Sequence, residues 1–113
     1  MSYEIRFSSY FVKEAKRLNK RYKSFADDLA AFKDSILENP LQGTELAPGI
    51  RKIRMAIKSK GKGTAGGARV ITYNVIAKEQ DGLIVFLLIY DKSDTSNVKM
   101  NVVKDIVDEL GMN

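Results

Sequence analysis

Residues 83–90 form an uninterrupted apolar run, and this run constrains the fold more than any other feature of the chain. It is far too short to span a membrane, and the charged residues Asp91 and Lys92 follow it directly. A short apolar run bounded by polar residues is typical of a central β-strand that is covered on both faces. We therefore expect a sheet in which residues 83–90 form a central strand.

The periodicity of the apolar residues predicts the other elements. Residues 3–7 alternate as in a half-buried strand, and apolar positions at helical spacing predict one helix through Phe11 and Leu18 and another after Ser24 that ends before Pro40. The rest of the pattern predicts a turn-rich connection at 41–49, a strand at 51–58, a flexible glycine connector at 61–67, a strand at 68–77, a turn at 79–82 and a helix from about residue 98. The expected fold is a single α+β domain over residues 1–113, with a mostly antiparallel four-stranded sheet, an N-terminal two-helix hairpin and a C-terminal helix.

The chain contains no cysteine and no histidine. Their absence excludes zinc fingers, thiol nucleophiles, imidazole bases and disulfides, so we expect no metal and no cofactor. The glycines from Gly61 to Gly66 match the letters of a dinucleotide-binding loop, but such a loop leaves a strand and opens a helix, whereas this segment is expected to join two strands. The N-terminus carries no basic stub followed by an apolar stretch, and we expect a cytoplasmic protein with no membrane contact.

Charge is distributed unevenly along the chain. The 33 residues between Glu45 and Glu79 contain eight Lys and Arg and no acid, so this segment carries +8 while the whole chain carries +5. In the predicted strand at 51–58, Ile53 and its apolar neighbours point one way and Lys52, Arg54 and Lys58 point the other. A basic face of this kind favours contact with nucleic-acid phosphate. The alternative is an edge strand whose Lys and Arg discourage pairing between sheets.

Three segments in order resemble the RelE/ParE superfamily of toxins from bacterial toxin–antitoxin systems, and most closely its HigB-like branch. They are residues 50–54 (Ile-Arg-Lys-Ile-Arg), the glycine connector with the following strand at 60–71, and residues 87–92 (Leu-Leu-Ile-Tyr-Asp-Lys). The resemblance implies a RelE-like fold over most of the chain. It also implies an mRNA interferase, which is a ribosome-dependent endoribonuclease that blocks translation. Such an enzyme needs no metal, because the 2′-hydroxyl of the RNA attacks the adjacent phosphate and leaves a 2′,3′-cyclic phosphate.

The resemblance also implies roles for particular residues. Arg69 matches the arginine that stabilises the charge developing on phosphorus, Lys60 and Lys62 match lysines that contact phosphate or assist deprotonation, and Tyr90 and Lys92 match groups for base stacking or proton transfer. Lys52, Arg54 and Lys58 would hold the RNA backbone. The implied partners are the ribosomal A site with its mRNA and a HigA-like helix-turn-helix antitoxin, through which alone the protein would reach operator DNA.

Two other functions remain open at this point. ParE-like relatives on the same fold inhibit DNA gyrase, although they generally lack the full basic catalytic set. A non-catalytic RNA- or ribosome-binding module would also carry a basic face, without cutting RNA.

Overall fold

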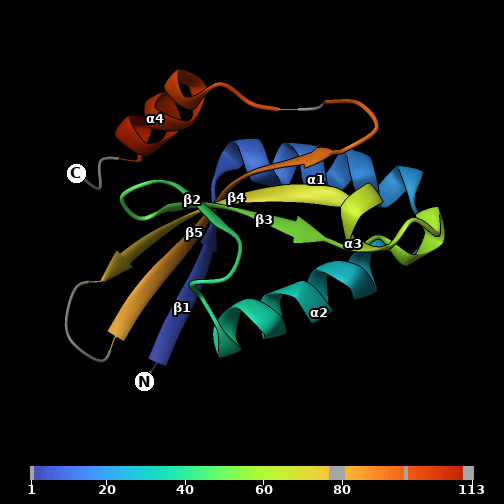
Figure 1. Cartoon of the computed structure of the whole chain (residues 1–113), viewed down its shortest axis with the longest axis horizontal. Coiled ribbons are helices and arrows are strands. Elements are labelled where there is room, and N and C mark those ends of the chain that lie inside the picture. The colour runs from blue at the N-terminus through green and yellow to red at the C-terminus, as the bar shows by residue number, and fades with distance from the viewer. Residues whose placement is uncertain (1, 77–80, 96, 111–113) are drawn as a thin grey trace.

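A five-stranded mixed sheet with helices on both faces forms the centre of the protein (Figure 1). The computed structural model describes residues 2–76, 81–95 and 97–110. The elements follow one another along the chain as β1 (Ser2–Phe7), α1 (Ser9–Arg21), α2 (Phe25–Glu38), β2 (Thr44–Ala47), β3 (Ile50–Met55), the 3₁₀ turn η1 (Lys58–Lys60), α3 (Gly63–Gly66), β4 (Ala68–Ile76), β5 (Asp81–Asp91) and α4 (Met100–Glu109). The expected α+β class is confirmed.

The sheet has the strand order β1-β5-β4-β3-β2. The expected count of four strands is wrong, because β2 forms within the segment 41–49 that was expected to be a connection; it pairs antiparallel with β3. The pairing is also mixed, since β1 runs parallel to β5 while the other neighbouring strands are antiparallel. β5 lies between β1 and β4, as expected for the apolar run.

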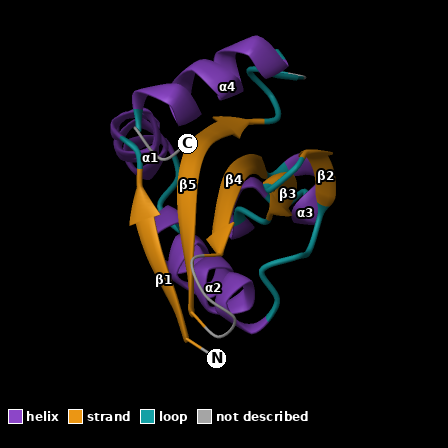
Figure 2. Cartoon of the chain, turned by 90° about the vertical axis from the view of Figure 1, so that its left-hand side faces the viewer, coloured by secondary structure: helices purple, strands orange, loops and turns teal. Residues whose placement is uncertain are grey.

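Two apolar clusters cover the two faces of this sheet. On one face, Phe11 and Leu18 of α1 and Phe32 and Ile36 of α2 pack with Phe86 and other side chains of β3, β4 and β5. On the opposite face, α4 contributes a second cluster with residues of the same three strands. Figures 1 and 2 accordingly show α2 and α4 at opposite sides of the molecule. Within the described ranges, no helix has the length and apolar character needed to cross a membrane.

The segment between β3 and β4 is more ordered than a flexible connector. β3 ends at Met55 rather than at Lys58, and the chain then makes η1 and the single helical turn α3. Gly61 and Gly63 adopt positive φ values of 72° and 63°, which only glycine tolerates readily, and they separate the two turns. The expected turn at 79–82 falls mostly on residues outside the described part of the chain, and β5 already begins at Asp81.

Candidate functional site

Helix α4 covers only one end of its sheet face. Ile50 of β3 lies under α4, together with Ile71 and Leu87. Two and four residues further along the same face of β3 are Lys52 and Arg54, which lie beyond the reach of α4. Figure 1 shows α4 toward the left end of the strands and α3 toward the right end. The uncovered end of this face is therefore the end next to α3.

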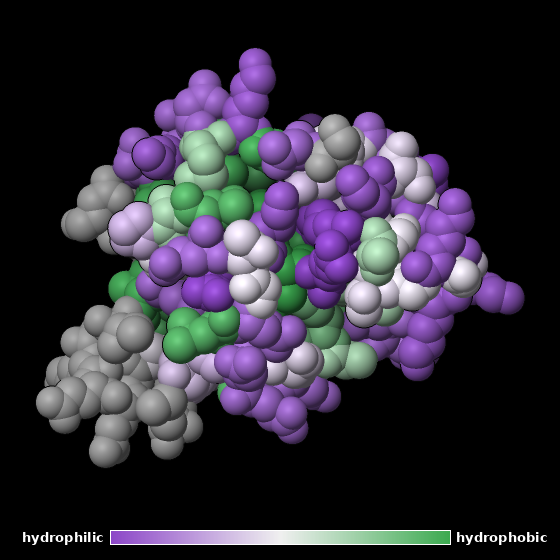
Figure 3. All heavy atoms as spheres, viewed as in Figure 1, coloured by the Kyte–Doolittle hydropathy of each residue, from purple (hydrophilic) through white to green (hydrophobic). Residues whose placement is uncertain are grey.

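A cavity of about 520 Å³ opens at this uncovered end. Its walls come from the loop before β2, from β3, from α3, from the start of β4 and from the residue after β5. The lining residues are Gln42, Gly43, Thr44, Lys52, Ile53, Arg54, Thr64, Arg69 and Lys92. Four of them are cations and none is an acid, and Figure 3 shows strongly hydrophilic atoms gathered in the middle of this face of the molecule.

The register of the strands explains why these cations converge. Arg54 of β3 lies directly opposite Arg69 of β4, and Arg69 lies directly opposite Tyr90 of β5. Residues that are directly opposite in antiparallel strands point to the same face of the sheet. The structure thus brings four of the predicted site residues to the cavity, Lys52, Arg54, Arg69 and Lys92, whereas Tyr90 lies beside Arg69 in the apolar cluster and does not line the cavity.

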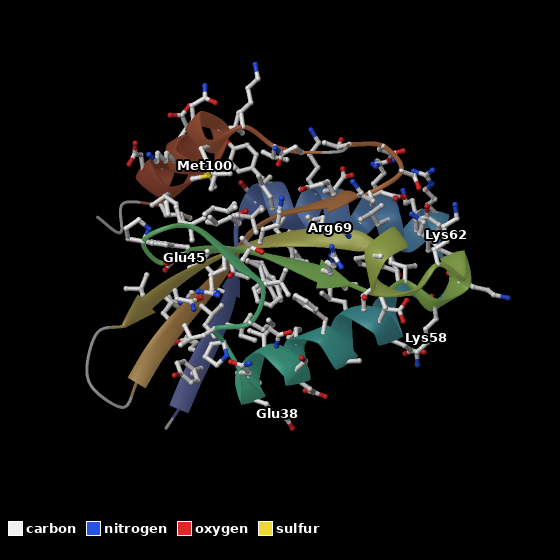
Figure 4. All side chains as sticks on the ribbon, viewed as in Figure 1. Glu38, Glu45, Lys58, Lys62, Arg69 and Met100 are labelled. Carbon is white, nitrogen blue, oxygen red and sulfur yellow. The ribbon has the colours of Figure 1, made fainter. Side chains whose placement is uncertain are left out.

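Arg69 is the most enclosed of these cations, with 7% of its surface exposed. Its guanidinium donates to three backbone carbonyls, those of Thr64 at 3.3 Å, Ala65 at 2.9 Å and Ala68 at 3.2 Å. Because a guanidinium has five N–H donors, two remain for a ligand while the carbonyls hold the group in place. Figure 4 shows Arg69 in the middle of this face, beside α3.

The described carboxylates form their ion pairs away from the cavity. Arg17 binds Glu14 and Asp94, Arg21 binds Asp91 and Asp94, and Lys60 binds Asp91. The remaining pairs among the described residues are Arg6 with Glu4 and Arg51 with Glu45. None of the ion pairs among the described residues includes Lys52, Arg54, Arg69 or Lys92. A buried cation without a carboxylate partner is costly, so the cavity favours an anionic ligand.

Tyr90 of β5 is the neighbour of Arg69 across the sheet. Its side chain is largely enclosed, and its hydroxyl has no hydrogen-bond partner among the described residues. Burial raises the pKa of Tyr90, and this effect outweighs the opposite influence of the Arg69 charge. Tyr90 is therefore a neutral phenol at neutral pH, and its enclosed hydroxyl is not part of the cavity lining.

Lys60 does not line the cavity. Its Nζ lies 2.6 Å from Asp91 Oδ1 and 2.8 Å from Ser93 Oγ, and the side chain is 5% exposed. Burial alone would raise the pKa of Asp91, but hydrogen bonds from Lys60, from the Tyr22 hydroxyl and from the Ser93 amide outweigh it and lower that pKa to about 2. Lys60 therefore joins η1 to the end of β5.

Lys58 and Lys62 also lie outside the cavity, and both are exposed at the right-hand end of the molecule (Figure 4). Sequence reasoning missed the polar residues Gln42, Thr44 and Thr64, which complete the cavity wall. Gln42 precedes β2, Thr44 begins it, and Thr64 is in α3. Finding these residues from the sequence would have required recognising β2 and α3 within the two predicted connections.

No model of a known protein family matches the chain. The fold and the site therefore define only a class, which is an α+β protein with a cation-lined cavity at the uncovered end of its sheet.

Proposed function

We propose that the protein is a ribosome-dependent mRNA endoribonuclease, the toxin of a bacterial toxin–antitoxin pair. The observation that carries the proposal is the cavity lined by Lys52, Arg54, Arg69 and Lys92 without any acid. A site of this composition suits the phosphate of an RNA strand, and guanidinium groups bind phosphate through two parallel hydrogen bonds. The chemistry needs no histidine, because the RNA supplies its own nucleophile.

In the proposed reaction, the 2′-oxygen attacks phosphorus and the bond to the 5′-oxygen breaks, which leaves a 2′,3′-cyclic phosphate and a 5′-hydroxyl. Arg69 stabilises the negative charge that develops on the phosphate oxygens, because the carbonyls of Thr64 and Ala65 already hold it in place. Lys92 takes the proton from the 2′-oxygen and returns one to the 5′-oxygen, and Tyr90 supports Arg69 from the neighbouring strand. Lys52 and Arg54 bind the flanking backbone.

The lysines outside the cavity take other parts in this proposal. Lys60 is a positioning residue: Asp91 lies between Tyr90 and Lys92 in the sequence, so the ion pair with Lys60 fixes the segment that carries both groups. Lys58 and Lys62 contact RNA from the exposed rim, where their charges add to the affinity without touching the reacting phosphate.

A helix-turn-helix antitoxin is the proposed protein partner. An apolar groove of about 270 Å³ runs between α1 and α2, with Phe7 and Val12 exposed along it and Lys16 in its wall. The Lys33 Nζ lies 5.4 Å from the centre of the Phe7 ring, so a second cation borders the groove. An acidic amphipathic segment of the antitoxin would match this surface in both polarity and charge.

Primer extension on a defined message in a purified translation system, with and without ribosomes, tests the endoribonuclease. Wild type is compared with Arg69→Ala and with Arg6→Ala, a matched control whose arginine is exposed and pairs with Glu4 on β1. We expect ribosome-dependent cuts within codons for wild type and Arg6→Ala, and cuts reduced on the order of 100-fold or more for Arg69→Ala.

The other outcomes identify the other functions. Arrested translation of an intact message would favour a non-catalytic ribosome-binding module. Unaffected translation would reject the ribosomal function, and inhibition of DNA gyrase supercoiling would then indicate a ParE-like toxin.

A further inference from the structure

A second hollow, of about 250 Å³, adjoins the cationic cavity. The two spaces share three lining residues, Gln42, Arg54 and Thr64. From these residues the second hollow extends past the end of β3 to the side of α2, where Asp28 and Ser35 line it. A ligand bound in the cationic cavity can therefore place a neighbouring group in the second hollow.

The lining of this hollow differs from that of the cavity. Its apolar part comes from Ala31, Phe32, Met55 and Ala56, and the rest of its lining is polar or charged: Asp28, Ser35, Gln42, Arg54, Lys58 and Thr64. A volume of about 250 Å³ corresponds to roughly eight molecules of liquid water, which is enough for a one- or two-ring heterocycle. An apolar surface with a few polar groups at its edge suits a flat ring that is recognised by its edge.

Asp28 supplies a carboxylate oxygen to this space. The residue is 5% exposed, and both of its hydrogen bonds are to Oδ2, from the Ser24 hydroxyl at 2.6 Å and the Lys58 amide at 3.0 Å. The described residues give no partner to Oδ1, and this oxygen is not among the fully enclosed unpartnered atoms. Oδ1 is therefore an accessible acceptor that two bonds on the other oxygen hold in place.

Gln42 supplies a second acceptor. Its Nε2 donates to the carbonyls of Ser35 and Asn39 and to the Ser35 hydroxyl, at 3.0 to 3.1 Å. Because a carbonyl oxygen only accepts, these bonds fix which end of the amide is nitrogen. Its Oε1, which has no partner in the described part of the chain, is left to accept a hydrogen bond from a ligand.

We propose that the hollow is a nucleobase pocket that selects a base with an exocyclic amine, such as adenine or cytosine, over uracil. The proposal rests on the proposed function, since the phosphate next to that base would lie in the cationic cavity. Asp28 Oδ1 is an acceptor, so an exocyclic amine at the edge of the base satisfies it, whereas the O4 carbonyl of uracil would face an acceptor without a proton between them. Gln42 is held by Ser35 and Asn39 about two turns further along α2, so its Oε1 offers an acceptor at a separate point of the hollow.

The substitution Asp28→Asn tests the pocket with little change in shape. The asparagine oxygen can keep the bonds from Ser24 and Lys58, while an NH₂ group replaces the free oxygen and turns an acceptor into a donor. Asp34→Asn is the matched control, because it removes the same charge at an exposed position of the same helix. Gln42→Met is a second variant, which removes the other acceptor together with the bonds from Gln42 Nε2 to the end of α2.

The first measurement is equilibrium binding of labelled rA4, rC4 and rU4 to each protein. We expect wild type and Asp34→Asn to bind rA4 and rC4 about tenfold more tightly than rU4, which corresponds to about 1.4 kcal/mol. In Asp28→Asn this preference should disappear or reverse, and in Gln42→Met it should weaken. Equal binding of the three oligonucleotides by wild type, no binding of any of them, or an unchanged preference in both pocket variants would overturn the proposal.

Mapping the ribosomal cuts of the same proteins separates this inference from the endoribonuclease. If base discrimination is present but the message stays intact, the pocket stands and the nuclease fails. If wild type cuts without regard to base, and Asp28→Asn gives the same map, the nuclease stands and the pocket is rejected.

Discussion

The ion pair between Lys60 and Asp91 allows a sharp test of what Lys60 does. In Lys60→Met, an apolar side chain of similar length replaces an ammonium group that lies 2.6 Å from the fully buried Asp91 carboxylate. Asp91 would keep the Tyr22 hydroxyl, the Ser93 amide and Arg21 at 3.3 Å, but it would lose its closest charge. Removing one partner of a buried pair costs about 3 to 5 kcal/mol, and the remaining partners place the expected loss near the lower end, at about 3 kcal/mol.

The dependence of this loss on pH follows from the Asp91 pKa. That pKa is lowered from 3.8 to about 2 in the folded protein, so the carboxylate stabilises the fold above the unfolded value and this contribution is lost as the pH falls toward 2. A difference of nearly two units corresponds to about 2.5 kcal/mol at neutral pH. Since Lys60 is the strongest of the groups that lower the pKa, the stability of Lys60→Met should change less between pH 5 and pH 2 than that of wild type.

Urea unfolding followed by far-UV circular dichroism measures both effects, because the chain has no tryptophan to serve as a fluorescent probe. Lys62→Met is the control, since it removes the charge of an exposed lysine of the same connection. We expect a destabilisation of about 3 kcal/mol at pH 7 for Lys60→Met and less than about 0.5 kcal/mol for Lys62→Met. Equal stability of the two variants at pH 7 would refute the reasoning. Loss of RNA cleavage by a Lys60→Met protein of unchanged stability would instead assign Lys60 a direct catalytic role.

Other predictions concern the cavity and its supports. Arg69→Ala should reduce the rate of message cleavage, measured by primer extension, on the order of 100-fold or more. Tyr90→Phe should change the free energy of unfolding in urea by less than about 0.5 kcal/mol, because the hydroxyl it removes has no partner among the described residues. Gly67→Ala should lower that free energy by about 3 kcal/mol, since its Cβ would lie 2.1 Å from the Met55 carbonyl oxygen. A single-stranded RNA held by the four cavity cations and by Lys58 and Lys62 should bind with a logarithmic salt dependence of about −4, and Lys52→Ala should reduce that slope by about 0.7 in fluorescence titrations at several salt concentrations.

Periodicity predicted the elements that bury a regular apolar stripe and missed those that do not. The helices through Phe11 and Phe32 and the apolar strand β5 were predictable, because each has a face that packs into a core. β2 has only four residues and none of them is fully buried, so it leaves too little pattern to be distinguished from a loop. The alternation in β1 does not specify which strand it pairs with. Its parallel pairing with β5 depends on the path of the chain through α1 and α2.

The positions of candidate site residues on strands could be predicted from strand geometry. The positions of those in the connection between β3 and β4 could not. Alternation along β3 puts Lys52 and Arg54 on one face, and antiparallel pairing adds Arg69. No comparable rule predicts the direction of a side chain in a connection. In η1, Lys60 points toward Asp91 and not toward the cavity.

The same contrast explains why a stretch without acids is an incomplete guide to function. Two of its cations find acids from outside the stretch, Arg51 with Glu45 at 3.9 Å and Lys60 with Asp91 at 2.6 Å. Lys52, Arg54 and Arg69 have no ion-pair partner among the described residues, although they lie in the same stretch. An acid neutralises a cation through proximity in space and not through proximity in the sequence. The cations available to bind a ligand are therefore those that have no ion-pair partner in the folded protein. Arg69 is the strongest example, since the carbonyls that hold it carry no charge to neutralise it.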